Sequence, residues 1–118
     1  MTEQHFPSDA PLISMPALTP AALRTAIAQI APARLPSFGE HLDQAVEQAA
    51  AQSTTAPLRA FLQYWGEVVA IQRRPDRAAR LRELEAAADA ASDRETLDPV
   101  IAEIQQILEW AQREVVAA

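Results

Sequence analysis

The sequence predicts an all-α fold, a compact bundle of about five helices preceded by an extended, proline-containing arm at residues 1–18. Two observations lead to this prediction. The chain has only two glycines and is rich in alanine, leucine, glutamate, glutamine and arginine, which favour helices. Apolar residues also recur at helical spacing through residues 19–118, in segments that prolines separate. A length of 118 residues is normally one domain, so we expect residues 19–118 to form a single helical domain.

The arm itself shows no helical or strand periodicity and carries three prolines, which remove backbone donors and restrict the preceding residue. It is nevertheless too apolar for a purely solvated tail. We therefore treat four of its residues as a candidate partner-facing surface that packs along the bundle or against another protein. These residues are Phe6, Leu12, Ile13 and Met15.

The first two helices are expected near residues 20–31 and 37–52. Thr19 suits the N-cap of the first helix, and Pro20 suits its first position. For the second helix, Ser37 and Glu40 have the spacing of a capping box.

The central helix is expected near residues 57–74 and should contribute most to the core. Its apolar positions fall at i, i+3, i+4, i+7, i+10 and i+11, the stripe of an amphipathic helix. They are Leu58, Phe61, Leu62, Trp65, Val68 and Val69. Gly66 lies within this helix, where glycine costs about 1 kcal/mol relative to alanine, and this indicates that another backbone passes close to it.

The last two helices are expected near residues 77–91 and 99–115. Pro75 should stop the central helix, and Asp76 should cap the next one. For the final helix we prefer a start at Asp98-Pro99 over a capping box at Ser92–Glu95. The predicted core of the bundle comprises Leu23, Ile27, Phe38, Leu42, Leu58, Phe61, Leu62, Trp65, Val69, Leu81, Ile104 and Leu108.

The composition argues against several classes of protein. The net charge of −6 disfavours binding to nucleic acid or to an anionic membrane, and no apolar run approaches the length of a membrane span. The N-terminus has no signal-peptide pattern, and the absence of cysteine fits a reducing cytoplasm. We therefore expect a cytoplasmic protein.

Few residues in the sequence suit catalysis or the binding of a metal or cofactor, so we expect no catalytic residue, no metal site and no cofactor. The two histidines, His5 and His41, belong to no cluster with metal-ligand spacing, and His41 is expected to be solvated or to cap its helix. No phosphate-binding loop, nucleophile elbow or HExxH motif occurs. An enzyme is not expected.

The segment RRPDRAARLR at residues 73–82 differs from the rest of the chain in its local charge. It holds five arginines against one aspartate, a local charge of +4 in an acidic chain. The candidate interaction cluster comprises Arg73, Arg74, Arg77, Arg80 and Arg82. These side chains could grip phosphates or an acidic partner, or they could cap helix ends and pair with nearby acids. We favour the second interpretation, because a protein that reads DNA usually has a wider basic surface.

The order of apolar and proline positions over about residues 19–90 resembles a family of small all-helical bacterial proteins of unknown function from GC-rich genomes. The resemblance lies in a Leu/Ile helix, a proline corner, an F-x-x-x-L-x-x-A helix, a P-L-x-x-F-L-x-x-W helix and a proline break. In this chain it runs through Leu23, Pro32, Phe38, Leu42, Ala45, Pro57, Leu58, Phe61, Leu62, Trp65, Pro75 and Leu81. It implies an antitoxin-like role and transfers no active-site residue.

Three hypotheses follow. The first is a small non-catalytic protein-interaction module, antitoxin-like, that binds a protein partner or forms a homodimer through its last two helices. The alternative is a nucleic-acid-binding regulator that uses the Arg73–Arg82 cluster. The second alternative is a helical enzyme or small-ligand binder with a pocket near Trp65 or Trp110. The acidic charge and the missing catalytic motifs favour the first.

Overall fold

A computed structural model describes residues 10–118, and the described part of the chain is entirely helical apart from its connections and the arm. It contains five α-helices, one short 3-10 turn and no strand, which confirms the predicted all-α class. The elements are α1 (Pro20–Ile30), η2 (Pro32–Arg34), α2 (Leu35–Gln52), α3 (Ala56–Gln72), α4 (Pro75–Ala90) and α5 (Arg94–Ala117).

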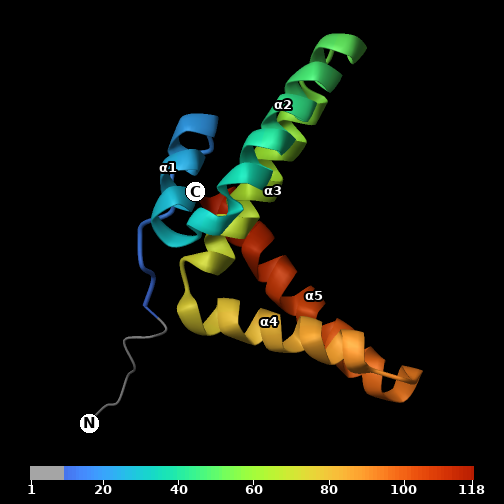
Figure 1. Cartoon of the computed structure of the whole chain (residues 1–118). Coiled ribbons are helices and arrows are strands. Elements are labelled where there is room, and N and C mark those ends of the chain that lie inside the picture. Colours follow the sequence, from blue (N-terminus) through green and yellow to red (C-terminus); the bar gives the residue numbers. More distant parts are fainter. Residues whose placement is uncertain (1–9) are drawn as a thin grey trace.

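Helix α3 is the centre of the fold, because it packs against α1, α2, α4 and α5. The short turn before it makes α2 and α3 one antiparallel hairpin, and α4 and α5 form a second. Figure 1 shows the two hairpins diverging from the end of α3, so that the molecule has the outline of an open angle.

The buried side chains form two clusters, one for each hairpin. The first lies among α1, α2 and α3 and is built around Leu23, Phe38 and Phe61, none of which is exposed. The second lies among α3, α4 and α5 and contains Ile71, Leu84 and several small alanines. Helix α3 contributes to both, because its consecutive buried residues from Val69 to Ile71 point to different sides.

The predicted core is largely confirmed. Six of its residues are buried, namely Leu23, Ile27, Phe38, Phe61, Trp65 and Val69. Five others are half-buried at the edges of the clusters, namely Leu42, Leu58, Leu62, Leu81 and Ile104. Leu108 was predicted wrongly, because 37% of it is exposed while Ile107 and Ala111 fill the interior of α5. Several adjacent positions of α5 are apolar, so its sequence does not define one buried face.

The start of α5 also differs from the prediction. The helix begins at Arg94, because the Asp93 carboxylate accepts a hydrogen bond of 2.8 Å from the backbone N–H of Thr96. The same bond lowers the pKa of Asp93. Pro99 therefore lies inside the helix, where it cannot donate to the carbonyl of Glu95. A good cap and the partial burial of Leu97 outweigh that missing hydrogen bond.

Two other predicted caps are wrong for a common reason. Helix α2 begins at Leu35, directly after η2, and Ser37 lies inside it. Helix α4 begins at Pro75, so Asp76 lies in its first turn instead of at the cap. In both helices a proline occupies one of the first two positions, where its fixed φ is already helical and its missing N–H costs nothing.

The atoms nearest to a Cβ placed on Gly66 belong to side chains of the arm and of α5. A Cβ atom built on Gly66 would lie 2.9 Å from Cδ2 of Leu18 and 3.1 Å from Cγ2 of Val115. Leu18 belongs to the end of the arm and Val115 to the last turn of α5. The absence of a side chain at Gly66 thus lets the arm and α5 both pack closely on α3.

Candidate interaction surfaces

The arginines of the 73–82 segment bind other parts of the chain. Arg73 is buried at the end of α3, and its guanidinium donates at 2.6 Å to Glu114 of α5 and at 3.2 Å to the carbonyl of Ile13 in the arm. Arg74 lies 4.0 Å from the same carboxylate and 5.7 Å from the ring centre of Trp110. These two side chains join the arm, α3 and α5.

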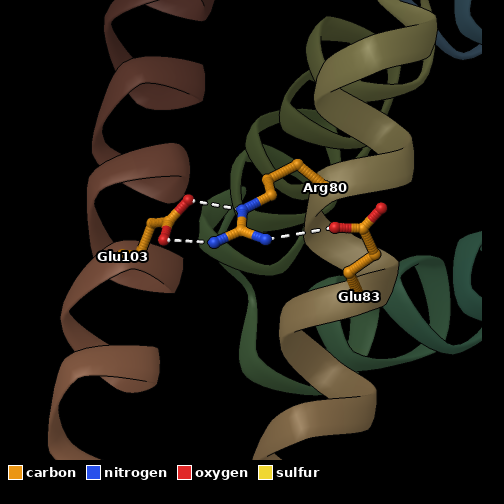
Figure 2. Close-up of polar contacts among 3 residues, drawn as sticks. All are labelled: Arg80, Glu83 and Glu103. Atoms are coloured by element: carbon orange, nitrogen blue, oxygen red, sulfur yellow. Dashed lines mark hydrogen bonds and ion pairs between the residues drawn. The ribbon is translucent and has the colours of Figure 1, made fainter.

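The next two arginines join α4 to α5. The Arg77 guanidinium lies 3.9 Å from the ring centre of Trp110, within the range of a cation–π interaction. Figure 2 shows Arg80 between Glu103 of α5, which it binds through two hydrogen bonds of 2.7 Å, and Glu83 of its own helix. These contacts raise the pKa of Arg80, and they lower the pKa of Glu103.

Four of the five candidate arginines therefore have protein groups as their observed partners, and the fifth, Arg82, is exposed on α4. In the structure these arginines mainly connect the arm, α3, α4 and α5 to one another, instead of forming one basic surface. This arrangement favours the structural interpretation, since an arginine that grips phosphate must first give up these contacts.

The described part of the arm lies against the bundle. The N–H of Leu12 donates at 2.7 Å to the carbonyl of Arg73, although its side chain is 59% exposed. Ile13 packs on the first cluster, and Met15 packs on both clusters. Of the candidate partner-facing residues, Leu12 alone is exposed, Ile13 and Met15 are half-buried, and Phe6 lies outside the described residues.

His41 is neither solvated nor a helix cap. It is half-buried beside α3, and its Nδ1 accepts a hydrogen bond of 2.9 Å from the indole N–H of Trp65. Because that indole nitrogen can only donate, Nδ1 must be unprotonated and the other ring nitrogen carries the proton. The imidazole also makes edge contacts with Phe61 and Tyr64. Its role is to satisfy the polar atom of a buried tryptophan.

A groove that the sequence did not indicate lies in the angle between α3 and the second hairpin. Its floor is apolar, with Val68 and Ile71 from α3, Leu81 from α4 and Leu108 from α5. Tyr64 stands at its edge, half exposed. The rim carries both signs of charge, from Arg34, Glu67, Arg82 and Glu85. We call this feature the inner groove.

The inner groove results from the angle between α3 and the hairpin of α4 and α5. The sequence alone does not define that angle, so it indicated the groove only indirectly. Tyr64 lies off the apolar stripe of α3, whereas Leu108 was assigned to the predicted core of the bundle. Neither residue indicates a groove by itself. Only the angle between the hairpins places them near each other.

In residues 10–118, no group of three histidine, cysteine or acidic side chains could hold a metal ion. No helix within this described range is long and apolar enough to cross a membrane. Comparisons of the chain with models of protein families, with curated proteins and with solved structures find no match.

Proposed function

We propose that this chain is a small, non-catalytic protein-interaction module whose inner groove binds a helix of a protein partner. The observation that carries the proposal is the groove itself. It combines an apolar floor on three helices with a charged rim, the arrangement that suits an amphipathic helix.

Exposure of the apolar groups supports the proposal. Tyr64 is 50% exposed and Leu108 is 37% exposed, although both line the groove together with Ile71, a buried residue of the second cluster. Burying such a side chain fully is worth about 1.5–3 kcal/mol, so covering the groove would stabilise a complex. The resemblance to small helical bacterial proteins extends the proposal to an antitoxin-like role, in which the partner would be a toxin.

Site-specific photo-crosslinking in cells tests the proposal. A photoreactive amino acid at Tyr64 should give an adduct with one defined protein, whereas the same amino acid at Gln48, exposed on the outside of α2, should give none. The change Leu108→Glu should abolish the Tyr64 adduct, because it places a charge on the apolar floor. A Tyr64 variant that gives no adduct, or one that is equally strong with Leu108→Glu, would refute the proposal.

The nucleic-acid alternative has its own test. A mobility-shift titration at low salt should show no tight retention of DNA or RNA, because the net charge of −6 repels phosphates and four arginines are already engaged. Tight retention that Arg77→Ala and Arg82→Ala both weaken would reverse the ranking of the two functions.

A further inference from the structure

His41 joins α2 to three aromatic side chains of α3. The centre of its ring lies 5.1 Å from that of Phe61, 5.6 Å from that of Tyr64 and 6.3 Å from that of Trp65. The indole N–H of Trp65 donates to Nδ1 of His41 over 2.9 Å. Because Trp65 is only 3% exposed, water has little access to that N–H, and the imidazole is the partner that satisfies it.

This hydrogen bond requires a neutral His41. An indole nitrogen donates and does not accept, and a protonated imidazole has two donors and no acceptor. Protonation of His41 would therefore place two N–H groups against each other and leave the buried indole without a partner, which is costly. Histidine ordinarily changes its charge between about pH 5 and pH 8, so mild acid should break this contact.

The charged groups around His41 do not compensate for that loss. The helical elements packed on α2 are α1, η2 and α3. The charged and titratable residues of these elements and of α2 itself are Arg24, Arg34, Glu40, Asp43, Glu47, Arg59, Tyr64 and Glu67. The acids of α2 are exposed, and Glu67 of α3 accepts a hydrogen bond from Gln63 on its own helix. Among residues 10–118 no acid forms an ion pair with His41, so no carboxylate stabilises the protonated ring.

The same aromatic side chains reach the edge of the inner groove. Tyr64, which lines the groove, contacts the rings of both His41 and Trp65, and the centres of the Tyr64 and Trp65 rings are 5.3 Å apart. Tyr64 is 50% exposed, so its position depends on the contacts that its other half makes with these rings. A change in the bond between His41 and Trp65 therefore also changes the packing of Tyr64.

We infer that His41 is a pH-sensitive contact: the neutral ring holds α2 on α3 and fixes Tyr64 at the edge of the inner groove, and protonation releases both. The inference rests on the proposed function where it concerns binding, because it gives the inner groove a dependence on pH. The unfolded chain takes up a proton on His41 freely, whereas the folded chain must give up the Trp65 bond. The contribution of this pair to stability is therefore present at neutral pH and is lost as the pH falls.

Urea unfolding of the full chain at about pH 7.5 and about pH 5.5, on either side of the ordinary histidine transition, measures this contribution. In His41→Asn the Oδ1 atom is bonded to Cγ, as Nδ1 is, so it can accept from Trp65 but does not titrate. Relative to His41→Asn, the folding equilibrium constant of the parent should fall about three- to tenfold between the two pH values. His5→Asn removes the only other histidine and is the matched control, so it should keep the full decrease. Parallel changes in the parent and in His41→Asn would overturn the inference.

Nuclear magnetic resonance of the folded parent chain tests the connection to the groove without a variant. Tyr64 is the only tyrosine, so isotopic labelling of tyrosine gives one set of ring signals. As the pH falls, the Trp65 indole proton should shift upfield with the same midpoint as the His41 ring signals, and the Tyr64 signals should follow that midpoint. A Trp65 proton that stays constant while His41 titrates would overturn the inference, and constant Tyr64 signals would overturn its connection to the groove.

These outcomes are distinguishable from those of the photo-crosslinking experiment, because they use the chain alone. If Tyr64 gives no adduct, the proposed function fails even when the three sets of signals titrate together. If Tyr64 gives its adduct but the signals stay constant, the proposed function stands and the pH dependence fails.

Discussion

Gly66 allows the packing of the whole molecule to be tested with a single methyl group. In an ordinary helix interior, glycine to alanine stabilises the fold by about 1 kcal/mol. At Gly66 the new methyl group would stand 2.9 Å from Leu18 and 3.1 Å from Val115. Such overpacking typically costs about 1–3 kcal/mol. The two effects together predict that Gly66→Ala destabilises the protein by up to about 2 kcal/mol.

The chain provides a matched control in its other glycine. Gly39 lies inside α2, and a Cβ atom there would have no neighbour within 4 Å. Gly39→Ala should therefore stabilise the protein by the full helical gain of about 1 kcal/mol. Urea unfolding at equilibrium, followed by circular dichroism, measures both variants against the parent, and their unfolding free energies should differ by about 1–3 kcal/mol.

A second change identifies which neighbour resists the methyl group. Val115 is β-branched and has little rotational freedom in a helix, whereas Leu18 lies on the arm and can be shortened. In the Leu18→Ala background, Gly66→Ala should be less destabilising, by about 0.5–3 kcal/mol of coupling in a double-mutant cycle. If Gly66→Ala stabilises the protein as much as Gly39→Ala does, the close approach of the arm and α5 to α3 is wrong.

Three further predictions concern the core, the ion pairs and the arm. Phe61→Ala removes a fully buried ring of the first cluster and should cost about 3–5 kcal/mol in urea unfolding; a loss below about 1 kcal/mol would place the wrong face of α3 in the core. Because Arg80 lowers the pKa of Glu103 in the folded state, this contribution to stability is present above the ordinary glutamate pKa of 4.5 and is lost as the pH falls through the lowered value. Glu103→Gln should therefore flatten the loss of stability in acid, and an unchanged acid profile would show that the pair does not form. Arg73→Met removes the hydrogen bonds to the arm and to α5 and should cost about 1–3 kcal/mol, with faster hydrogen exchange at the Leu12 amide; an equally protected Leu12 amide would show that the arm is held by other contacts.

The secondary structure of this protein follows from local sequence. Apolar spacing identified five helices, and a proline at one of the first two positions marks the start of each of the first four, because its fixed φ suits the first turn. The errors occurred where two local signals competed. Asp93 and Asp98 could each begin the last helix, and the earlier cap prevailed because its carboxylate holds the Thr96 amide. Similarly, the first-turn prolines set the starts of α2 and α4 ahead of Ser37 and Asp76.

Only the tertiary structure determines which residues the charged and exposed side chains contact. Residues 73–82 form a basic cluster in sequence, but their partners Glu103 and Glu114 come from α5, more than 20 positions away along the chain. The inner groove likewise joins Tyr64, Leu81 and Leu108 from three helices. Local sequence sets the periodicity of each helix and hence its apolar face. The angle at which two such faces meet depends on side chains such as Leu18 and Val115 packing around Gly66, and no local pattern contains that information.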